Sequence, residues 1–379
     1  MFNSIALLGI RLQLLIGREA TPLPAPYDVV DALTGLSVTN NDRERDGFRL
    51  EFSVGRGSSL DYGLLQSGIL DVPTRVIIMM FFGARPQALI DGHITDLQMI
   101  PSNEPGRSAL HVTGEDISVK LSYEDQNETY PNQSDSTIVR QILSRAGFVP
   151  QVTDTEDTPR QNERIPTQQC NHLRFIRNLA RRNGFVFYVE PTDIPGVNTA
   201  YWGPERREGR VQPPLTMNMG PYTNVDTPIN FHYNGLGPVE PEITVINPLT
   251  KQPLSIPVPT SLLSSLSSNP ARPLRKSRSR DTANLSFAQA LLRATTGVAD
   301  SASVLEATGE VDAARYGQAL RARRLVAVRG AGQSYDGTYY VQKVEHDIKR
   351  FPQPAYKMRF TLQREGRGAS STSVGPLTE

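Results

Sequence analysis

Alternating apolar and polar positions, broken by glycine and proline, dominate residues 1–122. Residues 48–54 alternate in this way directly after the pair Asp46-Gly47, which is the pattern of a β-hairpin. The segment 75–82, RVIIMMFF, is apolar throughout and predicts a strand that is buried on both faces or lies at an interface. Many short strands at such spacing predict a β-barrel or a β-sandwich.

The apolar N-terminal run IALLGIRLQLLIG raises the question of a signal peptide. Arg11 interrupts the run, no basic residue precedes it, and no small-residue cleavage site follows it. Its length and pattern therefore predict a buried β-strand. No segment reaches the ~18 uninterrupted apolar residues that a transmembrane helix needs, so we expect a soluble protein without a membrane span.

The pattern changes to a helical one between residues 123 and 223. Ser134 or Ser136 can cap a helix that carries apolar residues at i, i+4 spacing and ends at Gly147. The same organisation returns in NHLRFIRNLARRNGFVFYVE, where Asn171 can cap a helix, Gly184 can end it, and a strand follows. We expect residues 123–223 to form an inserted α/β domain.

The second of these helices is amphipathic. Leu173, Ile176 and Leu179 lie on one face, and arginines lie on the other. We expect the arginine face to contact solvent or a neighbouring protein, with these candidate interface residues: Arg174, Arg177 and Arg181.

Strand patterns return in residues 224–258, with a hairpin around Asn247-Pro248, and again in 323–365. We expect these two segments to form a second β domain. Residues 259–322 separate them and predict a Ser/Pro/basic loop followed by helices over 284–323, and residues 366–379 predict a flexible tail. The fold class is therefore mainly β, with α/β and helical insertions.

Composition removes several classes of function. Lys and Arg number 40 and Asp and Glu 39, so the chain lacks the excess positive charge of a protein that coats nucleic acid. A single cysteine excludes an intrachain disulfide and a CxxC zinc site. The five histidines show no zinc-ligand spacing. They are His93, His111, His172, His232 and His346.

No catalytic or phosphate-binding motif is present, and we expect no enzyme activity, no cofactor and no metal. Cys170 and His172 diverge around a helix start, which disfavours a catalytic dyad. One basic cluster stands out and predicts a solvated loop or, as the alternative, a contact with an acidic partner. It consists of Arg272, Arg275, Lys276, Arg278 and Arg280.

The C-terminal region resembles the phage late control D family, the baseplate hub proteins of contractile tails and related injection systems. The resemblance rests on RYG, RARRLVAVRGAG, YDGTYYV, VEHDI and FTLQREG, and on the helix–strand unit at 171–190. It covers residues from about 30 to 365, and the order of these motifs is more specific than any one of them.

The resemblance implies a homotrimer in which each subunit supplies two tube-type β-barrels, 1–122 and 224–258 with 323–365. Such a ring has pseudo-sixfold symmetry and adapts a trimeric spike to the hexameric inner tube. The resemblance also implies wedge proteins as neighbours, assembly in the bacterial cytoplasm, and a place in a phage tail or released injection particle. Because little chain follows REG, we expect the spike to be a separate protein related to VgrG. The apolar strand supplies candidate residues for the subunit seam: Val76, Ile77, Ile78, Met79, Met80, Phe81 and Phe82.

Two other functions remain open from the sequence. One is a tail-associated peptidoglycan hydrolase on a β-barrel scaffold, although no shielded carboxylate pair is apparent. The other is a secreted carbohydrate-binding protein, which the single tryptophan, Trp202, disfavours.

Overall fold

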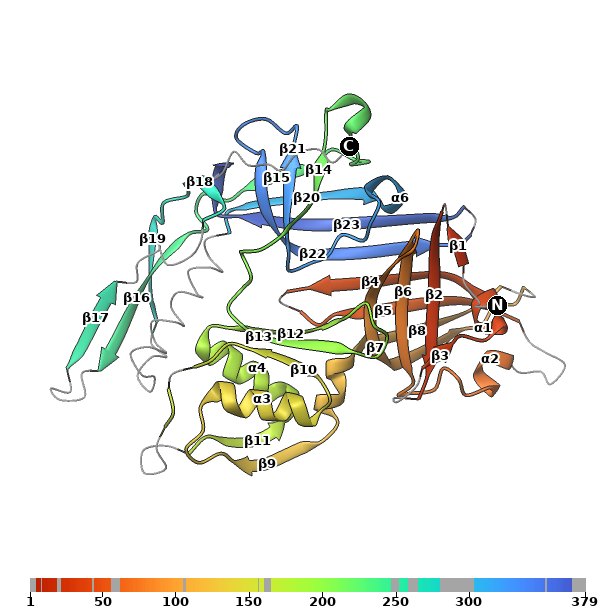
Figure 1. The fold of residues 1–379 in the computed structure, drawn as a ribbon, viewed down its shortest axis with the longest axis horizontal. Coiled ribbons are helices and arrows are strands. Elements are labelled where there is room, and N and C mark those ends of the chain that lie inside the picture. Colours follow the sequence, from red (N-terminus) through yellow and green to blue (C-terminus); the bar gives the residue numbers. More distant parts are fainter. Residues whose placement is uncertain are drawn as a thin grey trace.

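The computed structural model describes residues 5–7, 9–18, 22–42, 44–55, 62–104, 107–155, 157–159, 165–246, 252–257, 265–279, 303–351 and 353–369. Strands dominate these residues and helices are few (Figure 1). The mainly β fold class is therefore confirmed. No helix in the described part of the chain is long and apolar enough to cross a bilayer.

A 14-stranded sheet forms the body of the protein, with the order β1-β2-β6-β7-β8-β5-β4-β22-β23-β20-β15. β3 pairs with β2, and β21 pairs with both β22 and β14. The N-terminal half-sheet consists of β1 (Ile5–Leu7), β2 (Ile10–Gly17), β3 (Leu23–Pro24), β4 (Leu33–Asn41), β5 (Gly47–Val54), β6 (Arg75–Phe82), β7 (Arg85–Ile100) and β8 (Ser108–Asp116). The C-terminal half-sheet consists of β14 (Val211–Thr216), β15 (Asn230–Tyr233), β20 (Leu305–Asp312), β21 (Leu325–Arg329), β22 (Gly337–Lys349) and β23 (Ala355–Arg364).

The two half-sheets join where β4 pairs with β22, with Val38 opposite His346. Outward from this pair both halves repeat one antiparallel arrangement. β4 is followed by β5 and then β8, and β22 is followed by β23 and then β20. In each half, the strand at the junction and its neighbour are the two arms of a hairpin. The halves therefore share the pairing order of three strands, although β8 follows β5 in the chain whereas β20 precedes β22.

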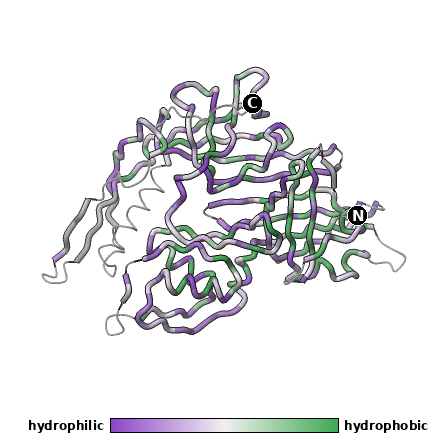
Figure 2. Tube along the Cα trace, viewed as in Figure 1, coloured by the Kyte–Doolittle hydropathy of each residue, from purple (hydrophilic) through white to green (hydrophobic). Residues whose placement is uncertain are grey.

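One apolar core serves both half-sheets. Inward-facing residues of β2, β5, β6 and β8 belong to the same cluster as those of β20, β22 and β23. Figure 2 shows the apolar trace concentrated along β2 and β6. The expectation of two separate barrels is corrected here, because the β4–β22 pair makes one sheet with an open strand order, and the described strands form no closed barrel.

The α/β module, defined as Asp125–Gly203, lies below the large sheet in Figure 1. Its strands follow the order β10-β13-β12, and a β9–β11 ribbon lies on the far side of its helices. Its elements are β9 (Asp125–Thr129), α3 (Asp135–Arg145), β10 (Val149–Val152), β11 (Thr167–Asn171), α4 (His172–Asn183), β12 (Val186–Pro191) and β13 (Asn198–Gly203).

The predicted ends of the two helices are confirmed. Ser134 accepts a hydrogen bond from the Thr137 amide at the start of α3, and Asn171 accepts one from the Arg174 amide at the start of α4. Gly184 ends α4 with a φ of 69°, in the left-handed region that glycine adopts without strain.

The helices predicted over 284–323 are wrong where the structure describes that segment. Residues from Leu305 form β20, which lies between β15 and β23, and only one helical turn follows before Gly317 adopts a φ of 80°. The alternating burial of β20 is that of a strand with one face in the core. Residues 284–302 and the turn around Asn247-Pro248 lie outside the described residues, although the strands that flank this turn pair antiparallel.

Smaller elements complete the fold. A three-stranded arm extends from the body (Figure 1). The prediction of a flexible tail over 366–379 is wrong for Gly366–Ala369, which pair with β18, and residues 370–379 lie outside the described residues. The arm strands are β16 (Val239–Ile246), β17 (Pro253–Pro257) and β19 (Arg275–Ser279), and the ribbon strands are β18 (Ser267–Pro270) and β24 (Gly366–Ala369). The short helices are α1 (Tyr27–Ala32), α2 (Gly63–Gln66), η1 (Ile117–Ser122), η2 (Gly220–Tyr222) and α6 (Ala313–Tyr316).

Candidate functional site

The apolar strand predicted to form a subunit seam lies inside the single chain. Val76, Ile78 and Met80 have no exposed surface and face the common core. Ile77 and Met79 face the other way, in a small cluster with Leu15 and Ala88. The chain itself covers both faces of β6, so these residues have no surface to offer a second subunit in this conformation.

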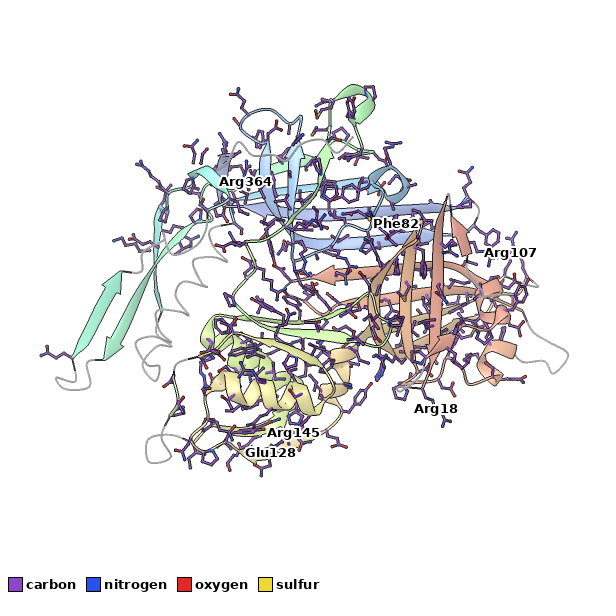
Figure 3. All side chains as sticks on the ribbon, viewed as in Figure 1. Arg18, Phe82, Arg107, Glu128, Arg145 and Arg364 are labelled. Atoms are coloured by element: carbon purple, nitrogen blue, oxygen red, sulfur yellow. The ribbon has the colours of Figure 1, made fainter. Side chains whose placement is uncertain are left out.

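Phe82, at the end of β6, also has a partner within the chain. Its ring centroid lies 6.2 Å from that of Tyr356 on β23, which places Phe82 between the two half-sheets (Figure 3). Phe81 and Phe82 are only partly buried. Of the predicted seam residues, these two alone keep exposed surface.

The arginines of α4 divide between two environments. Arg174 and Arg181 are exposed, as predicted. Arg177 is half-buried, and burial and the nearby Arg45 guanidinium lower its pKa, while Asp116 and Glu115 act in the opposite direction. The Arg177 side chain therefore also lies near the end of β8 within the chain, and its contact with a partner stays a prediction.

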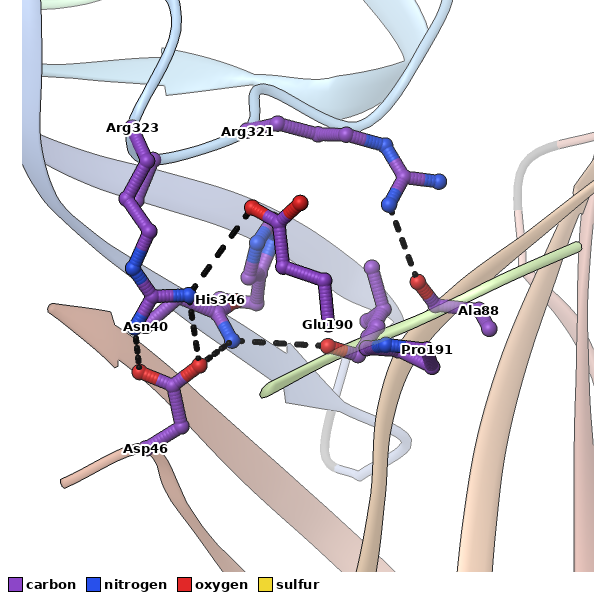
Figure 4. A pocket seen from close by; sticks show the side chains of 10 residues that line it. Asn40, Asp46, Ala88, Glu190, Pro191, Arg321, Arg323 and His346 are labelled. Carbon is purple, nitrogen blue, oxygen red and sulfur yellow. Dashed lines mark hydrogen bonds and ion pairs between the residues drawn. The ribbon is translucent and has the colours of Figure 1, made fainter. Parts of the chain in front are cut away.

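A buried ionic cluster lies where the α/β module meets both half-sheets, and we call it the junction cluster (Figure 4). The Arg323 guanidinium donates to both carboxylate oxygens of Asp46, at 3.0 and 2.6 Å, and to the backbone carbonyl of Asn41 at 2.5 Å. Glu190 of the module lies 3.9 Å from Arg323 and accepts a 2.8 Å hydrogen bond from Arg324. The Arg323 guanidinium also stacks over the Tyr188 ring, 4.3 Å from its centroid. One side chain thus connects three regions of the fold.

The attraction between opposite charges in the junction cluster offsets a high cost of removing these charges from water. Arg323 and Asp46 are each only 3% exposed. Burial by itself would lower the pKa of Arg323, but the Asp46 and Glu190 carboxylates outweigh burial and raise it. Burial, and then the neighbouring Asp46 carboxylate, raise the pKa of Asp116 to about 6. Burial lowers the pKa of His346 to about 3, and its Nδ1 lies 2.9 Å from the Tyr356 hydroxyl, so this histidine is neutral at pH 7.

A second polar contact joins the module to the N-terminal half-sheet. Arg75 donates to both oxygens of Asp91 at 2.7 and 2.6 Å, and Asn198 of β13 donates to Asp91 at 2.7 Å. Arg75 also donates to the Gly196 carbonyl at 3.2 Å. Both contacts satisfy buried charges with specific partners, and together they determine how the module sits on the sheet.

The cavity beside the junction cluster is too small for a substrate. Its volume is about 30 Å³, roughly that of one water molecule. Its two carboxylates, Asp46 and Glu190, are both directed at Arg323 (Figure 4). Within the described part of the chain, no cluster of three His, Cys, Asp or Glu side chains could hold a metal.

The C-terminal REG motif has a structural explanation. Arg364 is fully buried and donates to the carbonyls of Gly366, Asp336 and Ser334 at 2.9 to 3.0 Å (Figure 3). Glu365 forms an ion pair with Arg207 and accepts a 3.0 Å hydrogen bond from the Leu266 amide. The motif therefore connects β23, β24 and the loop before β22.

Sequence reasoning did not identify Arg323, Asp46 or Glu190 as a connected cluster. RARR resembles a surface basic run, and Asp46 resembles an ordinary hairpin-turn residue. Arg323 and Asp46 are 277 residues apart, so no local sequence pattern indicates that they meet.

Neither a protein-family pattern nor a curated protein matches the sequence of this chain. Its fold, however, is similar over most of its length to those of solved tail proteins. A tail protein from Neisseria meningitidis shares 13% identity at a TM-score of 0.63, with 93% of this chain and 97% of that one covered. A 43 kDa tail protein of prophage MuSo2 from Shewanella oneidensis shares 12% identity at 0.62, with 93% and 98% covered.

Injection-system proteins have the same fold. The E. coli c3393 protein, a type VI secretion component described as structurally similar to the T4 tail proteins gp27 and gp5, shares 13% identity at a TM-score of 0.53, with 92% of this chain and 76% of that one covered. A chain of the Francisella PdpA-VgrG complex shares 11% identity at 0.59, with 98% and 61% covered. This chain therefore has the tail-protein fold, as the resemblance to baseplate hubs predicted.

Proposed function

We propose that this protein is a non-enzymatic baseplate hub of a phage tail or a phage-tail-like contractile injection particle. The observation that carries the proposal is a tail-protein fold that extends over nearly the whole chain, 93% of it against the Neisseria tail protein. The buried charges of the junction cluster support a structural role. They pair with one another where the module meets the sheet, and the cavity beside them leaves no space for a substrate.

The repeated topology of the two half-sheets supports a role in symmetry matching. β4-β5-β8 and β22-β23-β20 present the same antiparallel order on either side of one strand pair. Three such chains in a ring would present six similar sheets, which suits a contact between a threefold spike and a sixfold inner tube. In this proposal the protein is a homotrimer that assembles in the bacterial cytoplasm. Its partners are a separate VgrG-like spike, the first ring of the inner tube, and baseplate wedge proteins.

Contacts in this assembly must come from exposed surface. Val76, Ile78 and Met80 are buried in the single chain, so Phe82 and the exposed Arg174 and Arg181 remain as proposed interface residues. Arg177 is half-buried beside β8, so only the exposed part of its side chain is proposed to contact a partner.

Light scattering and electron microscopy of the purified chain, alone and with its spike, test the proposal. We expect threefold rings with six similar lobes around a central opening. A chain that stays monomeric and forms no ring in the presence of its spike would contradict the hub function. A cell-wall turbidity assay tests the non-enzymatic part separately, since clearing that is lost on substitution of one carboxylate would indicate a hydrolase.

A further inference from the structure

A polar groove of about 700 Å³ lies at the end of the C-terminal half-sheet and shares no lining residue with the cavity at the junction cluster. We call it the basic groove. Its lining comes from the β18–β24 ribbon, the end of β15 and the loop before β22. These residues are Tyr233, Ser268, Asn269, Pro270, Ala271, Arg272, Gln333, Ser334, Arg367, Gly368 and Ala369.

The groove is built on a rigid support. The buried Arg364 holds the Ser334 and Asp336 carbonyls on one side and the Gly366 carbonyl on the other. The Gly368 amide donates to the Ser334 carbonyl at 2.9 Å, which joins β24 to the loop wall. At Gly366 and Gly368 a Cβ atom would collide with Asn269 and Ser268, so the two strands of the floor approach each other closely. The groove is therefore preformed and needs no rearrangement to receive a ligand.

The charged residues known to line the groove are basic. Arg272 and Arg367 are exposed and line it, and among the residues that the structure describes no Asp or Glu does so. Neither arginine forms an ion pair with any residue that the structure describes, and Arg367 is held by stacking over the Tyr233 ring, 4.4 Å from its centroid. The acidic residues nearest to Arg367 and Ser334 along the chain have other partners. Glu365 forms an ion pair with Arg207, and Asp336 accepts a hydrogen bond from the Ala331 amide.

The positive surface continues beyond the groove. Arg275 and Lys276 follow Arg272 along the chain and are exposed, and only Lys276 has an acidic neighbour, Glu240 at 3.7 Å. Leu274, between Arg272 and Arg275, is 73% exposed. Exposed guanidinium groups beside hydroxyl and amide side chains suit the bidentate recognition of carboxylates.

We propose that the basic groove binds an extended acidic segment of a partner protein. The groove follows the β18–β24 ribbon, with Ser268–Ala271 and Arg367–Ala369 along it, and an extended chain follows the same path. A peptide suits it better than nucleic acid, because Tyr233 is occupied by Arg367 and no other aromatic residue of the described chain lines the groove to stack on bases. This inference does not depend on the hub assignment.

Fluorescence polarisation with the full-length chain tests it. The probe is a short fluorescein-labelled peptide of alternating glutamate and serine, compared at low salt with the same peptide carrying glutamine. We expect binding of the glutamate peptide only, with an affinity that falls as salt rises. The variant R272A/R367A should weaken binding about tenfold or more.

The matched control is R174A/R181A, which removes two exposed arginines from α4 and should leave binding unchanged. R272A alone guards against a folding defect, since Arg272 makes no ion pair in the described structure, and it should weaken binding without a change in thermal stability. Equal loss in both double variants, tighter binding of a labelled oligothymidine, or no binding of the glutamate peptide at low salt would each overturn the proposal.

Discussion

The interior of the α/β module and the junction between the module and the large sheet are both buried, but they are stabilised by different forces. The hydrophobic cluster of the module includes Trp202, which has no exposed surface and meets Phe185 edge-on at 4.7 Å between ring centroids. The module also buries Asp135, which accepts a 2.6 Å hydrogen bond from Asn183. The junction holds Arg323, Asp46, Glu190 and Arg324, which form ion pairs with one another.

This difference concerns specificity as well as stability. Apolar burial is non-directional and tolerates small shifts between the packed elements. Buried ion pairs tolerate few such shifts. The attraction between the two charges offsets the cost of removing them from water only when their geometry is favourable. The module interior therefore stabilises a unit, whereas the junction determines where that unit sits. A scaffold protein needs both, since its partners bind to surfaces on different units.

The sharpest way to break the comparison is to remove the central cation. We expect Arg323→Met to lower the free energy of unfolding by about 4 kcal/mol, because it leaves the Asp46 carboxylate buried without a counter-charge. Urea unfolding followed by circular dichroism measures this, and R323M/D46N should recover part of the loss. The control is Arg359→Met, which removes an arginine that also has acidic partners but is 49% exposed, and it should cost about 1 kcal/mol or less. Equal losses for the two single variants would remove the distinction drawn here.

A smaller loss is expected in the module interior. Ile176→Ala creates a cavity at a residue with no exposed surface and should cost about 3 kcal/mol. Trp202 is the only tryptophan of the chain, so its fluorescence reports on the module while circular dichroism reports mainly on the large sheet. In this variant the fluorescence transition should move to lower urea than the circular dichroism transition. Val149→Ala, at a residue 48% exposed in the same module, is the control.

The third test uses pH at the edge of the junction. Because the folded pKa of Asp116 is raised from 3.8 to about 6, the folded protein binds the proton more tightly than the unfolded chain does. The stabilising effect of that proton is complete below pH 4 and is lost as the pH rises through 6. Asp116→Asn should therefore raise the free energy of unfolding at pH 8 by about 2 kcal/mol relative to its effect at pH 4. A difference that does not vary with pH would show that Asp116 titrates normally.

The smallest expected effect concerns a helix end within the module. Asn171→Ala removes the side chain that accepts from the Arg174 amide and should cost about 1 kcal/mol. Asn178→Ala lies on the exposed face of the same helix and should be neutral or slightly stabilising, since alanine has the higher helix propensity. Thermal unfolding of both variants measures the cap, and equal melting temperatures would exclude its contribution.

Local features of the fold were predictable because their causes are local. The caps at Ser134 and Asn171, the left-handed Gly184 and the alternation after Asp46-Gly47 each depend on neighbouring residues. The helix predicted beyond residue 311 failed for the opposite reason. Val311 and Asp312 pair with β23, where tertiary pairing outweighs propensity, and the helix is limited to the turn Ala313–Tyr316 because Gly317 ends it with a φ of 80°.

The seam prediction shows the same limit. An apolar run such as 75–82 indicates burial on both faces, and burial is confirmed for Arg75–Met80. The apolar sequence does not indicate whether a second subunit or the chain itself buries the two faces of this strand. In this fold the chain provides it, because one face of the strand packs in the core shared with β20, β22 and β23, and the other face packs in a small cluster with Leu15 and Ala88.

The sequence by itself determined the mainly β class, the two helix–strand units of the module and their ends, because periodicity, capping and glycine conformation act over a few residues. Only the tertiary structure decided that β4 and β22 join two half-sheets into one, that Arg323 meets Asp46 and Glu190, and that Arg364 supports the basic groove. These contacts join residues that are up to several hundred positions apart. Strand pairing and charge neutralisation depend on where the folded chain brings such residues together, and no local pattern specifies that.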